Sequence, residues 1–156
     1  MTGFLIRGLD PALFAPLFAL ADDALAARGA RRVVATGKPG FPCRVSLVDA
    51  EPGEQLILTH FEHQSADTPF RSSHAVYARE NARAAAAHRD TIPEQFRSRM
   101  LSLRAFDEAG MMVDADLVDG RAVEALIERM LAHPNTAYLH VHFAKPGCFA
   151  ARIDRG

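Results

Sequence analysis

Two histidines separated by one residue near the C-terminus form the pattern most suggestive of chemistry. His140 and His142 lie in the apolar run Tyr138-Leu139-His140-Val141-His142-Phe143. In a β-strand, side chains two residues apart point to the same face. Two neutral imidazoles on one face can bind a single transition-metal ion. The same pattern also fits histidines that only hydrogen-bond to loops or water, so both interpretations stay open.

A second group of histidines, His60, His63 and His74, surrounds a polar loop in the middle of the chain and makes up three of the seven histidines. An apolar run before the loop predicts a strand. In that strand His60 and Glu62 fall on one face, whereas Phe61 and His63 fall on the other. The two pairs therefore cannot both face the same partner.

The expected metal ligands are His60, His140 and His142. If their two strands are neighbours, these imidazoles and the Glu62 carboxylate converge, and His74 can join from the next strand. Three imidazoles that leave a position open suit a catalytic divalent transition metal. The cofactor hypothesis is therefore a divalent transition metal.

Basic residues at strand ends and in loops rich in glycine and proline suggest a site for an anion. Arginine forks bind carboxylates and phosphates through two oxygens at once, and neighbouring hydroxyls add donors. The alternative is a surface arginine that pairs with a local acid, such as Arg71 with Asp67. The expected ligand-binding residues are Arg44, Arg71, Ser72, Ser73, Arg104 and Lys145.

The two cysteines, Cys43 and Cys148, each follow a Lys-Pro-Gly turn and have a basic residue close by. Positive neighbours favour the reactive thiolate, and a thiol beside a histidine can act as a nucleophile. Cysteine is equally at home as a small buried apolar residue. The candidate catalytic residues are therefore His74, His140, His142 and Cys148.

The elements that must position these residues predict an α+β domain. Alternating or apolar runs predict strands at 4–7, 31–35, 43–48, 55–63, 74–79, 101–106, 111–118, 138–143 and 149–153. Helices are expected from Pro11 with a kink or early end at Pro16, at 23–28, from the Asn81 cap to 87, from Thr91 to 99, and from the Asp119 cap to about 133. Most are short, and the clear amphipathic helix is the last one, in the C-terminal half. Short turns between successive strands favour a mostly antiparallel sheet.

Length and composition limit the classes of protein. The 156 residues are 49% hydrophobic and 24% charged, which is typical of one globular domain, over 1–156. A net charge of -1 argues against nucleic acid as a partner, and no apolar run is long enough for a membrane. The apolar stretch 13–21 is interrupted by Pro16, so it predicts helix and not a signal peptide. A cytoplasmic location is expected, and a homo-oligomer is compatible with the sequence.

Several blocks of the sequence together resemble a bacterial family known as domain of unknown function 1203. The blocks are Lys38-Pro39-Gly40-Phe41-Pro42-Cys43-Arg44-Val45-Ser46-Leu47, Asp49-Ala50-Glu51-Pro52-Gly53-Glu54, Thr68-Pro69-Phe70-Arg71-Ser72-Ser73-His74-Ala75, Arg104-Ala105-Phe106-Asp107 and Tyr138-Leu139-His140-Val141-His142, with Lys145 and Gly147-Cys148. The resemblance implies a small, cytoplasmic bacterial domain. It brings no assigned activity, so no residue role comes from it.

Three functional hypotheses follow, and the sequence does not decide whether the protein is an enzyme. The first is a pocket lined by histidine and arginine that binds an anionic small molecule, with a histidine as acid or base if there is chemistry. The second is a non-catalytic module for a ligand or a protein partner. The third is a metal-dependent enzyme that uses the His140 and His142 pair.

Overall fold

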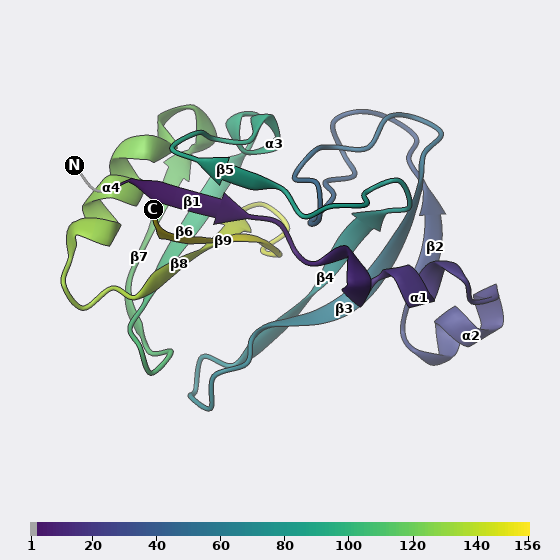
Figure 1. The fold of residues 1–156 in the computed structure, drawn as a ribbon, viewed down its shortest axis with the longest axis horizontal. Coiled ribbons are helices and arrows are strands. Elements are labelled where there is room, and N and C mark those ends of the chain that lie inside the picture. Colours follow the sequence, from purple (N-terminus) through teal and green to yellow (C-terminus); the bar gives the residue numbers. More distant parts are fainter. Residues whose placement is uncertain (1–2) are drawn as a thin grey trace.

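The computed structural model describes residues 3–156 as two antiparallel sheets joined by short helices and loops (Figure 1). The larger sheet has the strand order β5 (Ala87–Arg89), β1 (Phe4–Arg7), β9 (Phe149–Arg155), β8 (Tyr138–Phe143), β6 (Met100–Phe106), β7 (Met112–Asp119). The smaller sheet has the order β2 (Arg31–Val34), β3 (Gln55–Gln64), β4 (Ser72–Arg79). The helices are η1 (Pro11–Leu13), α1 (Ala15–Phe18), α2 (Asp22–Ala27), α3 (Glu94–Arg97), η2 (Gly120–Ala122) and α4 (Val123–Ala132). The predicted α+β class is confirmed.

The amphipathic helix α4 covers one face of the larger sheet. Its buried side chains repeat at helical spacing, and they pack on the alternate residues of β6 and β8 that point toward the helix. This apolar core includes Leu101, Leu103, Leu139, Val141, Leu126, Ile127 and Met130. The opposite face of the same two strands carries Ser102, Arg104, His140 and His142, because strand side chains alternate between faces.

The long β3–β4 hairpin of the smaller sheet reaches across to the tip of the β6–β7 hairpin (Figure 1). Thr68 donates its hydroxyl proton to the Gly110 carbonyl oxygen at 3.1 Å, and the rings of Phe70 and Phe106 meet edge to face. Gly110 has φ +84°, and a Cβ there would lie 2.3 Å from the Cβ of Ala66. Glycine is therefore required for both the turn and the contact that holds the hairpin over the sheet.

Two of the predicted elements are wrong. The segment 43–48 is a turn, in which Leu47 has φ +55° and its amide donates to the Cys43 carbonyl oxygen at 3.1 Å. The predicted helix at 81–87 does not form, and its last residue begins strand β5, which pairs with β1. An alanine run has helix propensity but no apolar stripe to bury, so pairing with an open sheet edge prevails. No helix among residues 3–156 has the length and apolar character needed to cross a membrane.

Candidate metal centre

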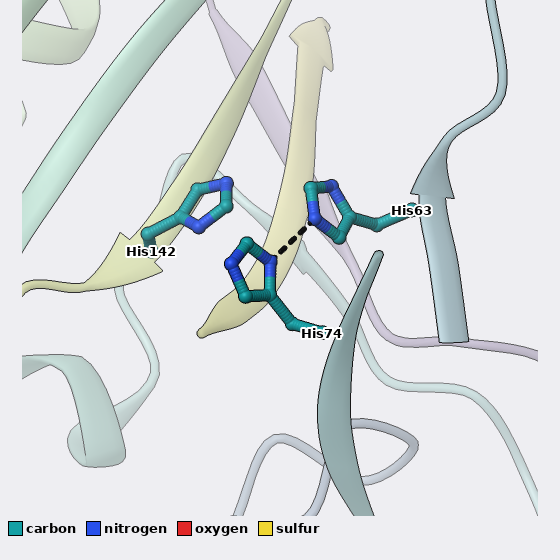
Figure 2. Close-up of side chains that lie close together, drawn as sticks. All are labelled: His63, His74 and His142. Atoms are coloured by element: carbon teal, nitrogen blue, oxygen red, sulfur yellow. Dashed lines mark hydrogen bonds between the residues drawn. The ribbon is translucent and has the colours of Figure 1, made fainter. Parts of the chain in front are cut away.

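Three histidines from the two sheets converge where the β3–β4 hairpin meets β8 (Figure 2). His63 lies near the end of β3, His74 near the start of β4, and His142 on β8 of the larger sheet. Each offers a ring nitrogen, and these three nitrogens all lie within 4.8 Å of one another. This spacing is the arrangement that a single metal ion bridges after small shifts of the rings.

Strand alternation and a bulge explain why His63 and His74 point inward. His74 pairs with Phe61 in the β3–β4 ladder, so the two side chains share a face, and the ring of Phe61 lies 6.2 Å from that of Phe149 on β9. The ladder register shifts between Glu62 and Gln64, which places His63 in a β-bulge. Bulges redirect side chains next to functional sites. Here the ring of His63 stacks on Phe149, with centroids 4.9 Å apart.

Hydrogen bonds fix the orientation of the three rings. Nε2 of His63 and Nδ1 of His74 share a hydrogen bond of 2.6 Å, and the Ser72 hydroxyl lies 3.1 Å from the same Nε2 atom. Nδ1–H of His142 donates to the Gly147 carbonyl oxygen at 3.0 Å. This bond leaves the lone pair on Nε2 of His142, which is buried and has no hydrogen-bond partner within residues 3–156.

The cluster is held in the neutral form that metal ions bind. Burial, then the neighbouring His74 and Arg104, lowers the pKa of His63 to about 4. Burial also lowers the pKa of His142 to about 3, with Arg104 and His63 adding to the effect. The pKa of His74 is lowered as well, by burial first and then by Arg104. At pH 7 all three imidazoles are therefore neutral.

His140 lies beside the cluster and is enclosed by aromatic rings. It is 3% exposed, and the rings of Phe106, Phe149 and His63 lie 5.0, 5.1 and 5.6 Å from its own. Its Nδ1 is buried without a hydrogen-bond partner among the described residues. Burial, followed by the neighbouring histidines, lowers the pKa of His140 to about 3. It is thus a second buried, neutral imidazole on the same strand as His142.

Arg104 adds a positive charge that no acidic side chain of the described residues neutralises. It lies opposite His140 in the β6–β8 ladder, and within residues 3–156 its one polar contact is a distant one of 3.5 Å to the Ser102 hydroxyl. Burial lowers the pKa of Arg104. A cation beside neutral imidazoles makes this region electropositive, which favours an anion.

The structure brings together only some of the residues expected from the sequence. His74, His142, His140, Ser72 and Arg104 lie in or beside the cluster. The expected convergence of His60 and Glu62 with His140 and His142 is not observed, because β3 pairs with β2 and β4 and its His60 side is exposed. The residue that takes the expected place of His60 is His63.

The remaining expected residues lie outside the cluster. Arg71 pairs with Glu62 at 2.9 Å on the exposed side of the hairpin, where Ser73 is the ladder partner of Glu62. Lys145 is exposed in the β8–β9 turn. Arg44 and Cys148 form a separate, partly buried contact at 2.9 Å. The two thiols are both free.

Sequence comparison finds one family for this chain. A family model described as a protein of unknown function, DUF1203, matches residues 40–155, which is more than half of the chain. The matched range includes the three clustered histidines and Arg104. No curated protein and no solved structure matches the chain.

Proposed function

We propose a function for this chain, which belongs to the DUF1203 family: it binds a transition-metal ion through His63, His74 and His142 and uses that ion on a small anionic molecule. The observation that carries the proposal is the convergence of three ring nitrogens within 4.8 Å of one another. Imidazole nitrogen is a good ligand for zinc, iron, nickel and copper. These metals are therefore the candidates.

The surroundings of the three rings support a catalytic more than a structural ion. The protein supplies three neutral ligands, which leaves a position for water or substrate, whereas structural zinc sites are closed by four. The hydrogen bond from Nδ1 of His142 to the Gly147 carbonyl is the outer contact that metal-binding histidines commonly have. An ion in such a site would polarise a bound oxygen or activate a water molecule.

Metal binding requires the hydrogen bond between His63 and His74 to open. Ligand nitrogens about 2.0–2.1 Å from a tetrahedral zinc ion lie roughly 3.3 Å apart, against the 2.6 Å of the hydrogen bond. The two ring nitrogens must therefore separate by about 0.7 Å, and the proton that they share must move to another nitrogen of its ring so that both present a lone pair to the ion. Because the imidazoles are already neutral at pH 7, binding should release no proton there and should weaken only in acid.

The zinc affinity of histidine variants tests the proposal. Chelator-treated protein is titrated with zinc against a chromophoric competitor, for the parent chain and for His63→Gln, His74→Gln and His142→Gln. The matched control is His60→Gln, because His60 is exposed on the same strand as His63. We expect the three cluster variants to lose roughly a hundredfold or more in affinity, as loss of a metal ligand does, and the control to bind normally. Equal affinity in all four variants would overturn the proposal.

A metal-free proton-transfer site is the second candidate. It is favoured by the Ser72 hydroxyl and Nδ1 of His74, which both lie within hydrogen-bond distance of Nε2 of His63, at 3.1 and 2.6 Å, so that as an acceptor this nitrogen can take the hydroxyl proton. A hydroxyl beside a neutral imidazole is the arrangement that activates a serine nucleophile. Labelling of Ser72 by a fluorophosphonate in chelator-treated protein would favour this function, and no labelling would leave the metal site as the function.

A bacterial cytoplasmic location is the compartment we propose for this activity. Both thiols are free, at Cys43 and Cys148, as is usual for proteins of a reducing compartment. Recovery of the protein in the periplasmic fraction of its bacterial host would contradict this location.

A further inference from the structure

A pocket of about 630 Å³ lies next to the histidine cluster and shares His74 with it. Its walls come from the loop before the 43–48 turn, from β3 and β4, and from the β8–β9 turn. The guanidinium groups of Arg44 and Arg99 form one side, and both lie over the ring of Phe143, at 5.0 and 4.9 Å from its centroid. The pocket thus combines two arginines with one histidine of the proposed metal centre.

Arg44 is a buried cation that has no acidic partner among the described residues. The residue is 1% exposed, and its guanidinium donates to the carbonyl oxygens of Phe149 and Pro42, at 2.7 and 2.6 Å, and to the Cys148 sulfur at 2.9 Å. These contacts use three of its five N–H donors and include no carboxylate within residues 3–156. A buried charge is costly unless it is compensated, so an anion in the pocket would stabilise it.

The second arginine of the pocket is already neutralised. Arg99 pairs with the buried carboxylate of Asp49, with distances of 3.1 Å to both oxygens, and it also donates to the Gln95 carbonyl oxygen. The net positive charge of the pocket wall therefore comes from Arg44. The other walls are apolar or aromatic and include Leu58, Tyr77 and Pro146.

We propose that this pocket binds a small organic oxyanion, a carboxylate or a phosphate monoester, with its charged group toward Arg44 and an apolar body against Leu58 and Tyr77. That this oxyanion is the substrate of the metal rests on the proposed function, because the link between the two is His74. The electrostatics agree, since three neutral imidazoles, a divalent ion and Arg104 leave the loaded centre without negative charge of its own.

Alkylation of Cys148 measures occupation of the pocket. Cys148 lines the pocket and is partly exposed, whereas Cys43 is fully buried and serves as an internal reference for unfolding. Chelator-treated protein reacts with iodoacetamide in the presence of benzoate, phenyl phosphate, inorganic phosphate or the neutral analogue benzamide. Mass spectrometry then gives the rate at each cysteine.

We expect roughly tenfold slower alkylation of Cys148 with about 10 mM benzoate or phenyl phosphate, which corresponds to a Kd of about 1 mM. If benzoate protects more strongly, the preferred ligand is a carboxylate; if phenyl phosphate does, it is a phosphate monoester. Equal protection by benzamide, or no protection by any compound, overturns the proposal. Equal protection by inorganic phosphate would overturn the proposed contact of an apolar body with Leu58 and Tyr77.

Three variants place the binding in this pocket. Ala75→Phe fills it from an exposed position of β4 without touching the Arg44 contacts, and protection should disappear. Arg44→Lys keeps the positive charge but removes the planar guanidinium that can bind two oxygens at once, so protection should weaken. Lys38→Ala, at a surface lysine that pairs with Glu51 and does not line the pocket, should leave protection unchanged. Protection that persists in Ala75→Phe would contradict the proposal.

The metal-loaded protein separates this inference from the proposed function. Zinc should lower the concentration of benzoate or phenyl phosphate that gives half protection, and His74→Gln should abolish that gain. Protection of the metal-free protein together with no zinc binding would keep the pocket and reject the metal centre. Zinc binding without protection would keep the metal centre and reject the pocket.

Discussion

The two faces of strand β8 in the larger sheet are both largely buried and are chemically opposite. Under α4, the strands β6 and β8 present side chains such as Leu103 and Val141, which pack without any polar atom to satisfy. Under the β3–β4 hairpin the same strands present His140 and His142, which are 3% and 0% exposed and each keep a ring nitrogen without a partner among the described residues. Each buried unpaired polar atom costs about 1–3 kcal/mol. The first face therefore stabilises the fold, and the second gives up stability in favour of a site.

The largest expected effect is on the apolar face. Leu103→Ala should lower the free energy of unfolding by about 3 kcal/mol, because Leu103 is fully buried and its truncation leaves a cavity. Urea denaturation measures this loss. The zinc affinity of the folded variant should stay within about threefold of the parent, since the Leu103 side chain points to the opposite face of the sheet from His140 and His142. A zinc affinity as low as that of His142→Gln would show that the two faces are not separate in function.

Acid should reveal the cost of the histidine face. Unfolded histidine has a pKa of about 6.5, whereas burial lowers the pKa of His140 and of His142 to about 3. Between these values the unfolded chain binds more protons, so the stability of the metal-free protein is complete above about pH 6.5 and falls as the pH decreases toward 3. The loss should be of the order of 1 kcal/mol per pH unit for each histidine.

Urea denaturation of chelator-treated protein at a series of pH values measures this slope. His60→Gln is the control, because His60 is exposed and should leave the slope unchanged. His140→Phe should reduce the dependence of the unfolding free energy on pH. A parent slope that equals that of His140→Phe would contradict the assignment of the acid sensitivity to the buried imidazoles.

Replacement of one buried imidazole by an apolar ring should raise stability. His140→Phe keeps the contacts with Phe106, Tyr138 and Phe149 and removes the unpaired Nδ1. The metal-free protein should gain about 1 kcal/mol, as measured at pH 7 by urea denaturation. Zinc affinity should change less than in His142→Gln, because His140 is not among the three converging ligands. A loss of stability would show that His140 has a structural role.

The smallest effect should come from the contact that holds the hairpin over the sheet. Thr68→Val keeps the shape of the side chain and removes the hydrogen bond to the Gly110 carbonyl. We expect a loss of about 1 kcal/mol in stability and a few-fold loss in zinc affinity, since His63 and His74 both lie on this hairpin. An unchanged zinc affinity would indicate that the hairpin is positioned by Phe70 and Phe61 instead.

The secondary structure was largely predictable because it depends on local patterns. The hairpin at Asp107 and Gly110 follows from turn chemistry, and α4 follows from apolar residues at helical spacing. The segment 81–87 was not predictable, because its conformation is decided by pairing with β1, more than seventy residues away in the chain. Local propensity gives way to tertiary contacts of this kind.

The site was predictable only in part. Alternation correctly separates His60 and Glu62 from Phe61 and His63, but nothing local tells which of the two faces meets the other sheet. The aromatic side chain of Phe61 could have indicated the inward face, because aromatic residues favour burial. His63 is two residues further along the strand and therefore points to the same face. The three histidines converge between two sheets, and the spacing of residues along the sequence does not reveal how two sheets pack against each other.

The metal content of untagged protein, purified without chelator, tests the central claim most directly. Elemental mass spectrometry should find close to one equivalent of zinc, iron, nickel or copper in the parent chain and in His60→Gln. His142→Gln should lose that metal while it stays folded by circular dichroism. Metal-free parent protein that also takes up none on addition of these ions would contradict the account, and so would a metal retained by His142→Gln.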